Sequence, residues 1–134
     1  MYDTILVATD GSEPADRAID HALDIASTFD ATLHALFVVD TRRYGNTMLE
    51  DSEATLSDLN ERGRDVLSTI EGEAAINVTT ELRNGAPHEQ IDAYAREIDA
   101  DLIVLGHRGL TSGDEIGSTA ERVVRYAERP VITA

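Results

Sequence analysis

Two segments of the chain combine glycine with polar side chains directly after an apolar run. The first is Ala8-Thr9-Asp10-Gly11-Ser12, and the second extends from Gly106 to Thr119. Glycine lets backbone N–H groups approach an anion closely, and a helix that starts there adds about half a positive charge. The carboxylate of an aspartate beside such a segment can accept a hydrogen bond from a ribose hydroxyl, or it can bind Mg²⁺ through a water molecule. These residue types are therefore candidates for binding a phosphate-containing ligand, with Asp10 as the candidate metal contact.

Both segments also have a purely structural interpretation. Asp10 can stabilise the dipole of a following helix without any ligand. Ser118-Thr119-Ala120-Glu121 matches the S-x-x-E capping box, in which Ser118 caps a helix and Glu121 reaches back to its first residue. The second segment matches neither G-x-x-x-x-G-K-[ST] nor G-x-G-x-x-G. Residue types and spacing alone leave ligand binding and helix capping open.

Other residues are weaker candidates for chemistry. His21, His34 and His88 lack the spacing of metal ligands, so we expect them at the surface or in packing contacts. No serine lies in a G-x-S-x-G motif. Arg42 and Arg43 could fold over a bound phosphate, but we expect them in a solvated loop. We therefore predict no catalytic residue, and at most slow nucleotide hydrolysis, because no water-activating base stands out.

The elements that would position these segments follow from the hydrophobic pattern. Apolar runs at 4–8, 33–39, 102–105 and 131–134 predict strands, and the alternating run 76–83 predicts a half-exposed or edge strand. Helices are expected between them, the first with Ser12 as N-cap and Pro14 in its first turn. Alternating strands and helices predict a parallel sheet covered on both faces. In such sheets ligands bind beyond the carboxyl ends of the strands, where both glycine segments lie.

The acidic composition and the absence of cysteine exclude several classes of protein. The chain of 134 residues has 26 acidic and 11 basic residues, all the basic ones arginine, for a formal net charge of −15. Such an acidic excess suggests adaptation to a salt-rich cytoplasm. It disfavours binding to nucleic acid or to an acidic membrane surface. Without cysteine there is no disulfide or thiolate metal site, and no apolar run approaches a membrane span. We expect one cytoplasmic domain over residues 1–134.

Taken in order, these segments resemble the universal stress protein family over essentially the whole chain. The similarity implies a Rossmann-like open sheet of five parallel strands in the order 3-2-1-4-5, and a homodimer paired through the last strand. The residues that carry the resemblance are Ile5 to Ser12, Leu36 to Asp40, Asp101 to Gly109, Gly117 to Thr119 and Arg129 to Ile132.

One branch of this family binds ATP and carries the pattern G-x2-G-x9-G-[ST]. The resemblance implies that Asp10 lies on the ribose or metal side, that Val38 offers backbone groups to adenine, and that the second glycine segment holds the phosphates. The nucleotide-binding residues predicted in this way are Ala8, Thr9, Asp10, Val38, Gly106, His107, Arg108, Gly109, Gly117, Ser118 and Thr119.

The sequence departs from the family pattern at two places. Seven residues separate Gly109 from Gly117 instead of nine, which shortens the loop by up to ~7 Å of extended chain. His107 stands where the family usually has a small hydroxyl residue. ATP, ADP and AMP therefore all remain open as the ligand, with Mg²⁺ to offset its charge.

The predicted function is that of a nucleotide-binding stress or regulatory protein with an unidentified protein partner. The alternative is a dimeric adaptor of the same family that binds no nucleotide and in which the Ser118–Glu121 box is only a helix cap. A third hypothesis is an enzyme of the adenine-nucleotide alpha-hydrolase type, for which the fold by itself is no warrant.

Overall fold

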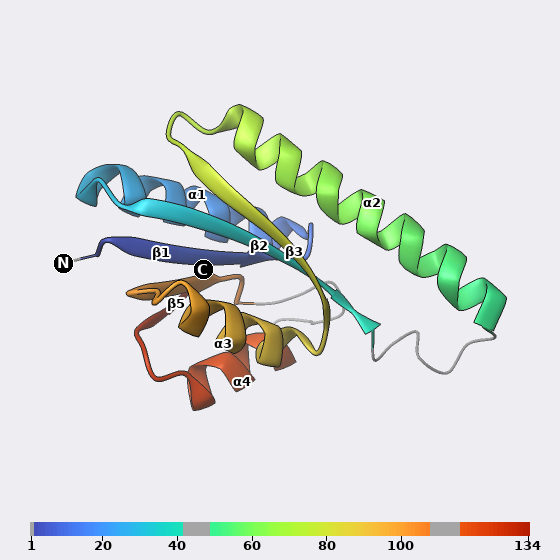
Figure 1. Cartoon of the computed structure of the whole chain (residues 1–134). Helices are drawn as coiled ribbons and strands as arrows, with labels where there is room; N and C mark the ends of the chain where they lie inside the picture. Colours follow the sequence, from blue (N-terminus) through green and yellow to red (C-terminus); the bar gives the residue numbers. More distant parts are fainter. Residues whose placement is uncertain (1, 42–48, 108–115) are drawn as a thin grey trace.

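Five parallel strands form a single sheet in the order β3-β2-β1-β4-β5. The computed structural model describes residues 2–41, 49–107 and 116–134 (Figure 1). This strand order is the one that the resemblance predicted. In chain order the elements are β1 (Thr4–Thr9), α1 (Glu13–Phe29), β2 (Thr32–Asp40), α2 (Leu49–Glu73), β3 (Val78–Gly85), α3 (Pro87–Glu97), β4 (Leu102–Leu105), α4 (Ser118–Tyr126) and β5 (Val131–Thr133).

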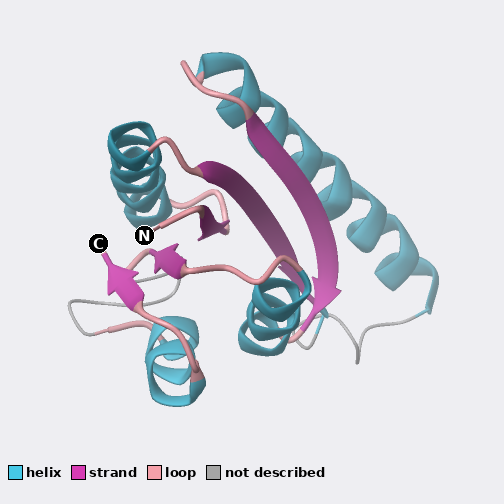
Figure 2. Ribbon diagram, turned by 60° about the vertical axis from the view of Figure 1, so that its left-hand side comes forward, coloured by secondary structure: helices cyan, strands magenta, loops and turns pink. Residues whose placement is uncertain are grey.

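Helices cover both faces of the sheet, α1 and α2 on one and α3 and α4 on the other (Figure 2). Successive side chains of a strand point to opposite faces, so each central strand contributes to two separate cores. In β1, Val7 packs toward α1 and α2, whereas Leu6 and Ala8 pack toward α3 and α4. Burial on both faces explains why these strands read as largely apolar runs in the sequence, with His34 of β2 as the polar exception.

The order of the strands reverses between β1 and β4. The chain passes from β1 outward through β2 to β3, then crosses to the far side of β1 to form β4 and β5. The connections after β1 and β4 therefore lead to helices on opposite faces, which is the position in open α/β sheets where ligands bind. The described parts of the two glycine segments, residues 8–12, 106–107 and 116–119, lie at this carboxyl edge.

The edge strand β3 begins two residues later than the alternation predicted. Val78 is the first residue to pair, opposite Leu33 of β2, and the strand continues to Gly85, opposite Asp40. Ile76 precedes the strand and packs against the core as a partly buried side chain. The alternating pattern reflects the burial of side chains and not the pairing of backbones. Ile76 is partly buried although the backbone pairs with β2 only from Val78 onward.

No helix in the described ranges is both long and apolar enough to cross a membrane.

Candidate functional site

The carboxyl edge of the sheet has a step between neighbouring strands. Ala8 of β1 lies level with Leu105 of β4 and with Leu36 of β2. Strand β2 then continues past the end of β1 to Asp40, so that Val38 stands just beyond the last β1–β2 pair. The last residues of β2 therefore have no β1 residue opposite them, and their backbone borders the space beyond the end of β1. Val38, one of the predicted adenine contacts, lies in this part of β2 with 9% of its surface exposed.

The turn from β1 into α1 is held by its own side chains. Oδ1 of Asp10 accepts a hydrogen bond from the Ser12 N–H at 2.9 Å, and Oγ1 of Thr9 accepts one from the Gly11 N–H at 3.1 Å. Ser12 is the N-cap of α1, as predicted, and its Oγ accepts from the Ala15 N–H at 3.3 Å. Within the described part of the chain the second carboxylate oxygen of Asp10 has no partner, and the residue is half-buried. Among the described residues, one carboxylate oxygen of Asp10 is thus left available for a ligand at the end of β1.

Gly11 fixes the path of this turn. Its φ is +80°, a conformation that residues with a Cβ adopt only at a cost. A Cβ at this position would lie 3.6 Å from Val66 of α2 and 3.7 Å from the Phe37 ring. Helix α2 therefore packs directly over the turn that carries Asp10, and the position of the helix bears on the site.

The N-terminus of α4 has no side-chain cap. Its N-cap residue is Gly117, in an extended conformation, and no side chain in the described ranges accepts a hydrogen bond from the first turn. The capping box of Ser118 and Glu121, one of the two interpretations left open by the sequence, is therefore wrong. Ser118 is already the first helical residue and is exposed, and Glu121 instead forms an ion pair with Arg125 one turn later. In a capping box the serine is the N-cap residue, whereas Ser118 lies one residue after the N-cap.

Backbone hydrogen bonds bring the start of α4 to the end of β4. The Gly117 N–H donates to the His107 carbonyl oxygen at 2.7 Å, and the His107 N–H donates to the Ala134 carbonyl oxygen at 2.8 Å. The imidazole Nδ1 of His107 lies 3.5 Å from Oγ1 of Thr133. The first turn of α4, which has no side-chain cap among the described residues, is thus held beside the carboxyl end of β4.

Most of the predicted nucleotide-binding residues fall at this edge. The end of β1 provides Ala8, Thr9 and Asp10, the end of β4 leads into Gly106 and His107, and the start of α4 brings Gly117, Ser118 and Thr119. Arg108 and Gly109 lie outside the described residues, as do Arg42 and Arg43.

The metal-binding groups at this edge could hold a metal ion only together with oxygen atoms of a bound ligand. The described residues contain no group of three or more His, Asp or Glu side chains that could bind an ion by themselves. Mg²⁺ commonly binds to one or two carboxylates and completes its shell with phosphate oxygens and water. The free oxygen of Asp10 fits that role.

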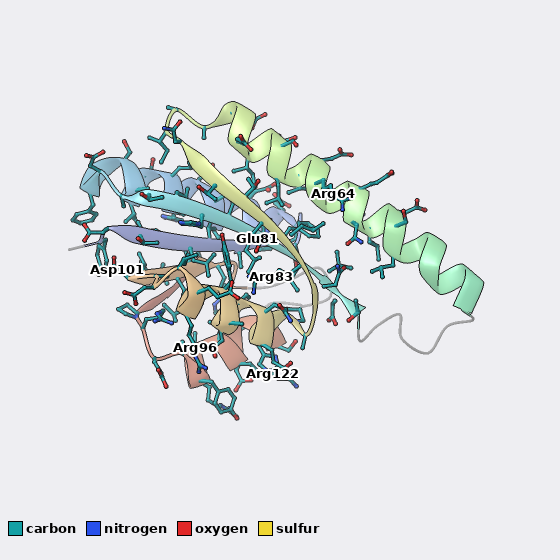
Figure 3. The ribbon with its side chains drawn as sticks, in the orientation of Figure 1. Arg64, Glu81, Arg83, Arg96, Asp101 and Arg122 are labelled. Atoms are coloured by element: carbon teal, nitrogen blue, oxygen red, sulfur yellow. The ribbon has the colours of Figure 1, made fainter. Side chains whose placement is uncertain are left out.

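A polar cluster on the α3 face was missed from the sequence. Nδ1 of His34 lies 3.0 Å from the Tyr94 hydroxyl, and the two rings meet edge to face. The guanidinium of Arg83 lies 4.8 Å above the Tyr94 ring and pairs with Glu81 and Glu97 (Figure 3). Burial lowers the pKa of His34 and raises that of Tyr94, because both charged forms lose hydration.

The sequence did contain a signal for this cluster. His34 alternates with Leu36 and Val38 and therefore faces α3, and Tyr94 lies one turn after Ile91 on the buried stripe of α3. A histidine and a tyrosine on facing buried surfaces need hydrogen-bond partners, and each is the nearest partner of the other. The cluster fastens α3 to the β3 edge of the sheet.

Comparison with known proteins places the chain in a family. The model of the universal stress protein family matches residues 1–134. Universal stress protein MJ0531 of Methanocaldococcus jannaschii is 36% identical over 138 residues, which cover 98% of this chain and 81% of the relative.

Solved structures agree with this sequence match. The hypothetical protein MJ0577, whose biochemical function was assigned from its structure, superposes with a TM-score of 0.89 at 27% identity, over 100% of this chain and 96% of its own. A universal stress protein in complex with cAMP superposes with a TM-score of 0.69 at 28% identity, over 99% of this chain and 96% of its own. Sequence and overall fold thus agree, and the chain belongs to the universal stress protein family.

Proposed function

We propose that the protein binds an adenine nucleotide at the carboxyl edge of β1, β2 and β4 and acts as a stress-response regulator. The observation that carries the proposal is the difference between two helix N-termini at the same edge. The first turn of α1 is capped by Ser12, whereas the first turn of α4 has no side-chain cap among the described residues and lies beside His107. Uncapped N–H groups at a helix N-terminus favour a phosphate.

The rest of the nucleotide is placed from the same edge. Asp10 directs its free carboxylate oxygen at the ribose or at Mg²⁺, and the β2 backbone at Val38 borders the adenine. Ala8, Thr9, Gly106, His107 and Thr119 complete the surroundings, with Arg108 and Gly109 in the connecting segment. The family member solved with cAMP supports an adenine nucleotide as the class of ligand. We expect at most slow hydrolysis, since no described side chain is placed as a water-activating base.

A homodimer through β5 is part of the same proposal. One edge of β5 pairs with β4 and the other has no strand among the described residues. Exposed apolar side chains gather nearby, with Val124 50%, Tyr126 66% and Ile132 38% exposed. An open edge beside apolar surface favours pairing with another chain. We further propose a salt-rich cytoplasm as the setting, and a regulatory protein that reads the bound state.

Calorimetric titration with ATP, ADP and AMP, each with Mg²⁺ in molar KCl, tests nucleotide binding. The decisive variant is Asp10→Asn, because the amide oxygen still accepts the Ser12 N–H and only the charge is lost. We expect the affinity to fall about tenfold or more, the usual cost of losing a hydrogen bond to a charged group. Asp30→Asn is the matched control, since Asp30 ends α1 at the opposite edge with φ 55°, which asparagine tolerates.

The outcomes separate the alternatives. Binding that Asp10→Asn weakens and Asp30→Asn does not supports the site. Equal affinity of both variants removes Asp10 from the site. No heat from a folded dimer with any of the three nucleotides would refute nucleotide binding and favour the adaptor function.

A further inference from the structure

A groove lies between α3 and α4, on the face of the sheet that these two helices cover. It has a volume of about 160 Å³, with Ile103 of β4 as its floor and Val123, Tyr126 and Ala127 along the α4 side. A cavity of ~150 Å³ with apolar walls is large enough to bind benzene. The groove therefore has room for one phenyl ring or one branched aliphatic side chain.

The two walls of the groove carry opposite charges. Helix α3 contributes His88, Glu89 and Asp92, and helix α4 contributes Arg122. Glu89 and Arg122 are both exposed, and neither forms an ion pair with any residue that the structure describes. A carboxylate on one wall thus faces a guanidinium on the other across an apolar floor.

Helical spacing explains why these two charges are unpaired. Arg96 pairs with Asp92 and Arg125 pairs with Glu121, each with the acid four residues earlier. Arg122 has Ser118 at that position, so no acid on its own helix can reach it. Glu89 has Ala93 four residues later, where a basic partner would stand. Figure 3 labels Arg96 of α3 and Arg122 of α4 on this side of the molecule.

We propose that this groove binds a small zwitterion with an apolar body, of the class of the apolar α-amino acids. The ammonium group pairs with Glu89, the carboxylate pairs with Arg122, and the apolar side chain lies on Ile103, Val123 and Ala127. A guanidinium matches the two oxygens of a carboxylate, which favours this orientation. This groove shares no residue with the proposed nucleotide site, so the two proposals can be tested independently.

Chemical-shift mapping of the full-length protein with L-phenylalanine and L-leucine tests the proposal. Both charges are exposed, so we expect weak binding, with a dissociation constant on the order of 1 mM. The shifts should map to α3 and α4 and spare the β1–α1 turn. Glu89→Gln and Arg122→Gln should each weaken binding about threefold to tenfold. Arg125→Gln, which changes a charge on α4 outside the groove, should leave the affinity unchanged.

Two analogues test the need for both charges. 3-Phenylpropionate lacks the ammonium group and 2-phenylethylamine lacks the carboxylate, so each should bind more weakly than L-phenylalanine. An amine that binds as well as the amino acid would make this a cation site and refute the proposal. The proposal is also refuted if neither amino acid shifts the α3 and α4 resonances up to its solubility limit, or if Arg125→Gln weakens binding as much as Arg122→Gln.

Discussion

Replacement of Gly63 by alanine tests how closely α2 packs on the sheet. Gly63 is buried in the middle of α2, over the side chains of Phe37 and Leu82. A Cβ there would lie 2.7 Å from Cδ1 of Leu82 and 2.8 Å from Cδ1 of Phe37. Carbon atoms prefer a separation of about 3.5–4.0 Å, so both contacts overlap by about 1 Å.

Two opposing effects decide the size of the change. Alanine in a helix interior is better than glycine by about 1 kcal/mol, and overpacking of a core costs about 1–3 kcal/mol. The Leu82 methyl group can yield at the half-exposed edge strand, whereas the Phe37 ring is 6% exposed and confined. We therefore expect Gly63→Ala to lower the free energy of unfolding by about 1 kcal/mol, near the middle of the range that these terms give.

Gly72→Ala is the matched control on the same helix. No atom lies within 4 Å of a Cβ at Gly72, so only the helix propensity changes and we expect a gain of about 0.5–1 kcal/mol. Urea unfolding in molar KCl measures both variants, and an unchanged m-value shows that stability alone has changed. The packing argument is refuted if Gly63→Ala stabilises the protein as much as Gly72→Ala does.

A displaced α2 should also affect the site. Val66 of α2 and the Phe37 ring both lie against the Gly11 turn that carries Asp10. We expect Gly63→Ala to weaken nucleotide binding, and Gly72→Ala to leave it unchanged, in the titration described above.

Three further predictions concern the cap, pH and salt. Ser12→Ala should cost about 1 kcal/mol in a urea titration, because the Ala15 N–H loses its acceptor; no loss would show that water replaces the cap. Burial holds the pKa of His34 below its ordinary 6.5, so the folded state favours the neutral ring, and stability should fall as the pH drops below about 6.5. His34→Gln should flatten that slope, and an equal slope in both proteins would refute the assignment. The urea midpoint should rise between 0.1 M and 2 M KCl as the charge of −15 is screened, and a midpoint independent of salt would contradict the proposed salt adaptation.

The sheet and its covering layers could be predicted from the sequence because their signals are local. Strand β4 was predicted to the residue, since Leu102 to Leu105 is a continuous apolar run that ends at a glycine. The N-cap at Ser12 was also correct, because the cap residue, the proline and the apolar stripe agree on one starting point. The order of the strands is not local information, and it came from the resemblance to a family.

The parts that could not be predicted depend on contacts across the fold. Helix α4 has Gly117 and not Ser118 as its N-cap, and the Gly117 N–H donates to the carbonyl oxygen of His107 at the end of β4. The pairing of His34 with Tyr94 joins residues 60 positions apart. The groove at Arg122 depends on the distance between α3 and α4, and the spacing of apolar residues along the sequence does not determine that distance.

The α3 and α4 layer differs from the opposite layer in ways that bear on motion. A groove lies between its two helices, and the polar cluster at His34 and Arg83 links α3 to the sheet. Helices α3 and α4 bury three and two apolar side chains, against five in α1, and fewer buried apolar contacts lower the free energy of local opening. Backbone amides of α3 and α4 should therefore exchange with solvent deuterium earlier than those of β1, β2 and α1. The two layers would then behave as separate cooperative units, and acid would release the α3 layer first.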